Sequence, residues 1–133
     1  MRKIKISFRS QMAEATLLEK EAPKACNAIW NRLPIEADVH CAKVAGEEVF
    51  FMVPFVLNPE RGGELLEAGS IAYFPPAQSI CIYYWSRAVR ARQATVFAKI
   101  TENLEGIVEE FKKVRYKQGD KILIQRACVQ RSS

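Results

Sequence analysis

The sequence predicts a mostly β protein, built as a closed or nearly closed antiparallel barrel with two helices that cap an open end or cover a flank. Two observations predict this architecture. Seven or eight strand-like segments are interrupted by only two amphipathic helical segments, whereas a doubly wound parallel sheet needs helices that alternate with strands. The chain of 133 residues is long enough to bury one core, and closure removes exposed sheet edges.

The most informative stretch of the chain is GSIAYFPPAQSICIYYW, residues 69–85. Two runs of β-branched and aromatic residues, Ile71–Phe74 and Ile80–Trp85, are joined by Pro75–Gln78. Proline cannot donate a hydrogen bond to a sheet, so the two prolines end the first strand and set a turn. Both runs are apolar on both faces, which predicts a hairpin that forms a wall between two packed layers.

The remaining segments supply the other strands and both helices. Residues 3–8 alternate basic and apolar side chains, which indicates a strand at an edge or with one face exposed. The first helix begins at Ala22-Pro23 and ends at Pro34, and Asn103 is a candidate N-cap for the second. In order, we expect strands at 3–8 and 12–19, a helix at 22–33, strands at 35–44 and 47–54, a short helical turn at 64–67, strands at 71–74, 80–85 and 94–100, a helix at 104–114 and a strand at 121–127.

Composition and cysteine usage indicate one cytoplasmic domain, residues 1–127, followed by a frayed tail at 128–133. No apolar run resembles a signal peptide or approaches the roughly 20 residues of a spanning helix, so we expect no membrane partner. The four cysteines lie singly in apolar segments, which favours buried, reduced thiols over a disulfide or zinc framework. One histidine with scattered acids is a weak ligand set, so we expect neither a metal nor another cofactor.

The net charge of +5 is unevenly distributed. No carboxylate occurs between Glu67 and Glu102, and this gap holds Arg87, Arg90, Arg92 and Lys99. Such a region makes a positive surface that attracts an anion, unless acids from elsewhere in the fold balance it. Nucleic acid is a weaker interpretation, because the basic residues do not line one helix and no known nucleic-acid-binding motif is present.

Four segments of the chain, taken in order, resemble those of a known protein family. They are a helix ending in ACNAIWNRLP, the strand pair HCAKVAGEEVFFMVP, the hairpin described above and the closing segment ATVFAKITENLEGIVEEF. Over roughly residues 1–127 the chain resembles small bacterial and archaeal cyclophilin-like proteins of unknown function. The resemblance implies an eight-stranded antiparallel barrel with two capping helices. It does not imply prolyl isomerase activity, since those enzymes carry a Phe-His-Arg type motif and here His40 is followed by Cys41.

The aromatic residues of the central hairpin predict a ligand-binding cleft. The period of two places Tyr83 and Trp85 on one face of their strand and Tyr84 on the other. If the first face points outward beside the basic connector, it makes an aromatic floor with a cationic rim, which suits a small anionic or planar ligand. The predicted ligand-binding residues are Tyr73, Tyr83, Trp85, Arg87 and Arg92, and the alternative for most of the aromatic ones is plain core packing.

A candidate acid–base pair lies one hairpin earlier. His40 is the only side chain that titrates near neutral pH without perturbation, and the turn at Ala45-Gly46 returns the next strand beside it. We therefore consider His40 as a general base that Glu48 orients, with Lys43 and Glu47 nearby. The competing interpretation is a set of solvated charges at a hairpin tip.

Three hypotheses follow from these observations. The first, which we favour, is a module that binds a small molecule without turnover. The second is a small hydrolase or isomerase that uses His40 and Glu48. The third is an interaction or assembly subunit in which Phe51, Tyr84 or Trp85 forms a homo-oligomer contact.

Overall fold

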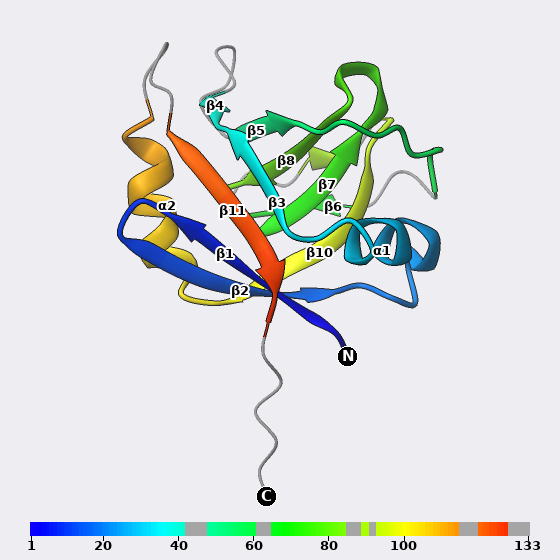
Figure 1. The fold of residues 1–133 in the computed structure, drawn as a ribbon, viewed down its shortest axis with the longest axis horizontal. Helices are drawn as coiled ribbons and strands as arrows, with labels where there is room; N and C mark the ends of the chain where they lie inside the picture. The colour runs from blue at the N-terminus through cyan, green and yellow to red at the C-terminus, as the bar shows by residue number, and fades with distance from the viewer. Residues whose placement is uncertain (42–47, 61–64, 85–88, 91–92, 115–119, 128–133) are drawn as a thin grey trace, which may run out of the picture.

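The computed structural model describes residues 1–41, 48–60, 65–84, 89–90, 93–114 and 120–127, whose arrangement is shown in Figure 1. The helices are α1, Pro23–Trp30, and α2, Leu104–Lys112, with a 3-10 turn η1 at Pro75–Ala77. No helix within these ranges is long and apolar enough to cross a membrane. The strands are β1 Lys3–Phe8, β2 Gln11–Leu17, β3 Ile35–Asp38, β4 His40–Cys41, β5 Glu48–Met52, β6 Leu65–Leu66, β7 Ser70–Phe74, β8 Ser79–Tyr83, β9 Val89–Arg90, β10 Thr95–Glu102 and β11 Lys121–Arg126.

The described strands form a nearly closed antiparallel barrel. Nine of them make one sheet in the order β3-β11-β1-β2-β10-β7-β8-β5-β4. The two ends of this order, β3 and β4, are separated in the chain by Val39 alone, so the sheet must curl until its ends meet. Figure 1 shows the curved sheet with α2 on one side and α1 on the other. The predicted mostly β barrel with two helices is confirmed.

The strand number differs from the expected eight because one predicted strand changes partner. The sequence predicts a single strand over residues 35–44, whereas β3 pairs with β11 and β4 pairs with β5. The backbone N–H of Val39 still donates to the carbonyl oxygen of Asp120 on the β11 side, at 2.9 Å. His40, the next residue, already pairs with Phe50. The turn predicted at residues 45–46 lies outside the described residues.

Strand β1 lies inside the sheet, between β2 and β11. Its alternation buries Ile4, Ile6 and Phe8 in the core and leaves Lys3 exposed. The prediction of one exposed face is therefore confirmed. The alternative of an edge strand is wrong, because the last strand of the chain returns to pair with β1.

The hairpin of β7 and β8 separates two apolar clusters, as the sequence predicts. On one face Ile71, Tyr73, Ile80 and Ile82 enter the main core. On the other face Ala72 packs in a second cluster with Leu66, Ala94 and Val96, against which Phe74 and Tyr83 are partly buried. Turn η1 occupies the diproline, and Gln78 completes the turn with a φ of 49°.

A small two-stranded sheet, β6 with β9, borders the second cluster. The sequence predicts a helical turn at residues 64–67, and this prediction is wrong at Leu65 and Leu66. Those two residues pair antiparallel with β9 instead, in the register Leu65 to Arg90 and Leu66 to Val89. Pairing satisfies the backbone of a segment too short for a stable helix and buries Leu66 against the hairpin.

The helices bury the predicted faces against the barrel. Helix α1 buries Cys26 and Ile29, and the Cys26 thiol donates to the carbonyl oxygen of Phe97 on β10 at 3.3 Å. Burial raises the pKa of this thiol to about 12. Helix α2 buries Phe111, whose ring centroid lies 5.2 Å from that of Phe8. Asn103 occupies the N-cap position with a φ of 60°, but its side chain makes no cap hydrogen bond to the helix.

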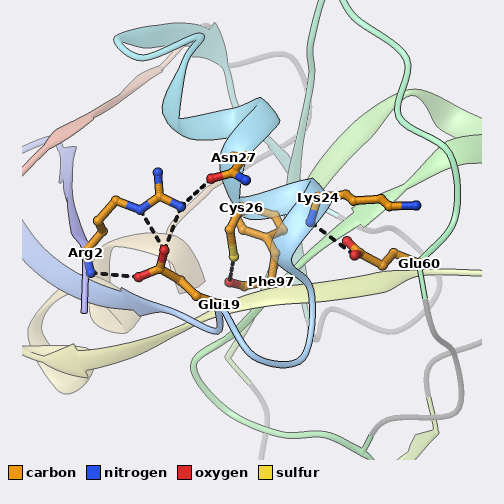
Figure 2. A network of polar contacts seen from close by, with 7 residues as sticks. All are labelled: Arg2, Glu19, Lys24, Cys26, Asn27, Glu60 and Phe97. Carbon is orange, nitrogen blue, oxygen red and sulfur yellow. Dashed lines mark hydrogen bonds and ion pairs between the residues drawn. The ribbon is translucent and has the colours of Figure 1, made fainter.

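The N-terminus of α1 is capped by a carboxylate from a distant loop. Ala22 stands at the N-cap position and has no polar side chain, and Pro23 lies in the first turn. The Glu60 carboxylate instead accepts hydrogen bonds from the backbone N–H groups of Lys24 at 3.1 Å and Ala25 at 2.9 Å. Figure 2 shows the first of these contacts. The backbone N–H of Glu60 donates to the Thr95 hydroxyl at 2.9 Å, so α1, the loop and β10 are tied together.

Replacement of Glu60 should weaken this connection measurably. Loss of an N-cap acceptor costs about 1 kcal/mol, so Glu60→Ala is expected to lower the free energy of unfolding in urea by about that amount. Glu60→Gln, which keeps one acceptor oxygen, should lose less. The control is Glu102→Ala, which removes a carboxylate from an exposed position. Equal losses in Glu60→Ala and Glu102→Ala would contradict the capping role.

Candidate functional site

The described residues of the predicted site lie on four strands. His40 is on β4, Glu48 on β5, Tyr73 on β7 and Tyr83 on β8. Residues 85, 87 and 92 lie outside the described residues, so the structure places only part of the predicted cleft.

The strand register places five residues at the centre of the candidate site. His40 pairs with Phe50, and Phe50 pairs with Cys81. Glu48 pairs with Tyr83, one row along the same strands. Directly opposed residues share a face of a sheet, as do residues two apart in one strand. These five residues therefore project from one side of the barrel wall, which we call the β4–β5–β8 face.

A half-buried polar cluster spans two rows of this face, with Cys81 beside Phe50 on one row and Glu48 beside Tyr83 on the next. Burial raises the pKa of the Cys81 thiol, and the nearby Glu48 carboxylate raises it further. Burial likewise raises the pKa of the Tyr83 phenol, with smaller contributions from Cys81 and Glu48. Both groups therefore remain protonated at neutral pH. The cluster offers a thiol and a phenol as donors next to a carboxylate acceptor.

His40 presents an accessible imidazole on the same row as Phe50 and Cys81. Its side chain is exposed, and its ring centroid lies 5.5 Å from that of Phe50 at an interplanar angle of 34°. Diagonal positions on paired strands are roughly 7–8 Å apart, so one small molecule lying on this face could contact both the His40 ring and the Glu48 carboxylate. The face therefore combines a flat aromatic surface with groups that accept and donate protons.

Tyr73 lies on the opposite side of the wall. It pairs with Ile80, is 1% exposed, and stacks on Phe55 with a centroid separation of 6.3 Å and an interplanar angle of 15°. Its hydroxyl donates to the carbonyl oxygen of Phe55 at 3.0 Å and accepts from the backbone N–H of Leu57 at 3.2 Å. The sequence groups Tyr73 with Tyr83 in one cleft, but the register places the two side chains on opposite faces of the sheet. Tyr73 braces the segment after β5 from within the core.

Two residues of the assembly hypothesis are also inside the protein. Phe51 is fully buried and Tyr84 is 9% exposed, and both belong to the main core cluster. They cannot form a contact between copies of the folded chain, because they face the barrel interior. The third residue of that hypothesis, at position 85, lies outside the described residues.

The structure bears on two further predictions, the state of the cysteines and the charge of the carboxylate-free stretch. Cys26 and Cys81 are buried free thiols, as predicted, and Cys41 is half-buried. Lys99 forms an ion pair with Glu67, so one charge of the carboxylate-free stretch is balanced by an acid at its border. Among the described side chains, no three His, Cys, Asp or Glu residues converge as a metal site would require.

The protonated phenol of Tyr83 predicts a stability change at alkaline pH. Below pH 10 the phenol keeps its proton in both states; above it, the unfolded chain releases a proton that the folded chain retains. The free energy of unfolding should therefore fall as pH rises. In Tyr83→Phe the fall above pH 10 should be shallower, by at most about 1.4 kcal/mol per pH unit. Urea titrations at pH 7 and between pH 9.5 and 11 measure this, and parallel curves for the two proteins would contradict it.

The brace formed by Tyr73 predicts a stability effect at neutral pH. Tyr73→Phe leaves a buried carbonyl oxygen and a partly buried N–H without their partner, which costs about 1–3 kcal/mol in the free energy of unfolding. Urea denaturation at pH 7 measures the loss. Tyr83→Phe is the matched control, because it removes the same hydroxyl group from a side chain that is only half-buried. A loss in Tyr73→Phe no larger than in the control would show that the brace contributes little.

Comparison with known proteins identifies relatives of the whole barrel. A family model described as cyclophilin-like matches residues 2–125. A hypothetical protein from Archaeoglobus fulgidus is similar over 95% of both chains, with 24% identity and a TM-score of 0.70. The structure of McbB in complex with tryptophan is similar over 92% of this chain but only 44% of McbB, with 14% identity and a TM-score of 0.79. At these identities the two structures show a shared fold, and no curated protein matches the chain significantly.

Proposed function

The chain belongs to the cyclophilin-like family, and from that premise we propose that it binds a small planar or anionic ligand on the β4–β5–β8 face. One observation carries the proposal. Glu48, Cys81 and Tyr83 meet in a half-buried cluster beside the half-buried Phe50 and the exposed His40. Convergent polar groups with perturbed pKa values on a partly apolar surface are typical of binding sites.

The chemistry of the face favours a flat molecule with both donors and acceptors. The protonated Tyr83 phenol and Cys81 thiol are hydrogen-bonded within the cluster, the phenol to the thiol and the thiol to Glu48, and the Glu48 carboxylate keeps acceptor lone pairs for a ligand. The ring of Phe50, which lies tilted against that of His40, offers a surface for a planar group. A neighbour of the same fold, McbB, was solved with tryptophan, a small planar molecule. Trp85, Arg87 and Arg92 complete the proposed site, where the two arginines would favour an anionic group.

The proposal does not include prolyl isomerase activity. The chain has no Phe-His-Arg run, and its single histidine is followed by a cysteine. A shared fold does not transfer an activity when the residues of the site differ.

A catalytic role for the same face is the second candidate. It is favoured by one observation, which is that His40 and Glu48 occupy adjacent rows on one side of the sheet. A ligand bound between them would meet an imidazole and a carboxylate, so His40 is the candidate general base and Glu48 its partner. In that case His40→Ala would abolish turnover and leave the melting temperature nearly unchanged.

A thermal-shift screen tests the proposed ligand site. The purified chain would be screened against metabolites weighted toward carboxylates, phosphates and cyclic amides. A ligand at about 100 times its Kd should raise the melting temperature by roughly 5 °C or more. The shift should shrink or vanish in His40→Ala, Tyr83→Phe and Arg87→Ala.

The control for the screen is Glu105→Gln, a change at an exposed position on α2. Its ligand-induced shift should equal that of the unmodified chain. A shift that survives in all three site variants would place the ligand elsewhere, and a panel without any shift would count against a small-molecule function on this face.

A further inference from the structure

A separate cavity opens where the barrel is not closed by hydrogen bonds. Among the described strands β3 pairs only with β11, and β5 pairs with β4 and β8, so no hydrogen-bonded ladder joins β3 to β5. A shallow cavity of about 330 Å³ lies in this seam. Its volume is at the lower end of the range for small-molecule sites. It is lined by Arg32, Pro34, Ile35, Glu36, Pro54 and Phe55.

The guanidinium group of Arg32 lines this cavity. The guanidinium carbon of Arg32 lies 4.5 Å from the centroid of the Phe55 ring. Among the described residues no carboxylate forms an ion pair with Arg32, and its side chain is exposed. A guanidinium stacked on a ring keeps the N–H groups along its edge available, and their fork matches a carboxylate.

A negatively charged group lines the same cavity. Glu36 is exposed and pairs across the sheet with Leu123. Within the described residues it is not within ion-pair distance of Arg32 or of any other cation. A simple anion at Arg32 would be opposed by Glu36, and a simple cation at Glu36 would be opposed by Arg32. A ligand that carries both charges satisfies both groups at once.

The backbone of β3 adds polar groups at this edge that do not bond to any other described strand. The N–H of Val39 donates to Asp120, so Val39, Ala37 and Ile35 are the positions that bond to β11. The intervening residue Glu36 therefore turns its backbone N–H and C=O away from β11, toward the seam. These groups are available to a polar ligand in addition to the two charged side chains.

The floor of the cavity is fixed before any ligand arrives. Phe55 is 5% exposed and is held by the stacked ring and the hydroxyl of Tyr73. The exposed rings of Pro34 and Pro54 provide stiff apolar walls. A site whose walls are already ordered pays less conformational entropy on binding.

We propose that this cavity binds a free α-amino acid with an apolar or aromatic side chain. The ligand carboxylate pairs with Arg32, its ammonium group pairs with Glu36, and its side chain lies against Pro34 and Pro54. The site shares no residue with the β4–β5–β8 face and does not depend on the function proposed there.

A neighbouring cavity does not offer the same pair of charges. It has a volume of about 300 Å³ and is lined by residues of α1 and of the segment 56–60, including Lys24 and Glu60. The Glu60 carboxylate is engaged by the first turn of α1, as Figure 2 shows. Lys24 is therefore a useful control position: a cation on the same flank of the protein but outside the proposed site.

Isothermal titration calorimetry on the full chain tests the proposal with three probes. L-phenylalanine carries both charges, 3-phenylpropionate lacks the ammonium group and phenethylamine lacks the carboxylate. Phenylalanine should bind at least about tenfold more tightly than either analogue, since each charge-assisted contact is worth a factor of that order. Arg32→Gln should reduce the affinity for phenylalanine to that for phenethylamine, and Glu36→Gln should reduce it to that for 3-phenylpropionate.

The controls separate this site from the rest of the molecule. Arg32→Gln should not weaken phenethylamine binding, because that probe has no carboxylate to pair with Arg32 and the charge that opposes its ammonium group is removed. Lys24→Gln, with the same change of charge, and His40→Ala should both leave phenylalanine binding unchanged. Thermal melting of each variant shows that it is folded. Equal affinities for the three probes, the absence of phenylalanine binding, or full binding by folded Arg32→Gln and Glu36→Gln would overturn the proposal.

Discussion

The barrel depends on the change of hydrogen-bonding partner at Val39. In a flat sheet of nine strands the first and last would lie roughly 38 Å apart, at eight spacings of about 4.8 Å. Here those two strands are β3 and β4, and only Val39 separates them in the chain. Two Cα–Cα steps span at most about 7.6 Å. The sheet therefore cannot open, and its curvature encloses the core that Phe8, Phe51 and Phe97 fill.

Closure gives the two faces of the barrel wall different roles. The inner residues of β7 and β8 build the core, and one of them, Tyr73, uses its hydroxyl to hold the segment from Phe55 to Leu57. The outer residues, Cys81 and Tyr83, keep their protons because burial disfavours their charged forms. A shift of one residue in strand register would exchange these roles, since it would move every side chain to the other face. The ladder from β5 through β8 to β7 thus fixes both the brace and the candidate site.

Local sequence patterns predicted the features that depend on periodicity alone. The bounds of β1, the two-sided hairpin and the buried faces of α1 and α2 follow from alternation or from helical spacing. The missed features depend on contacts between segments far apart in the chain. Nothing near Ala22 indicates that Glu60 caps α1, and nothing near Leu65 indicates a partner at Arg90. The grouping of Tyr73 with Tyr83 failed for the same reason, because register across a hairpin decides which aromatic residues share a face.

The partner change at Val39 also accounts for the seam. Because β4, and not β3, continues the ladder to β5, the edge of β3 at Glu36 is paired with no other strand in the part of the chain that the structure describes. The chain after β5 passes nearby, yet Pro54 cannot donate to a ladder, so it does not extend the sheet across the gap. Phe55 fills the inner side of the gap, and Arg32 stacks on its ring. One exchange of partners thus closes the barrel at His40, where the outward face carries the first candidate site, and leaves it open at Glu36, where the second one forms.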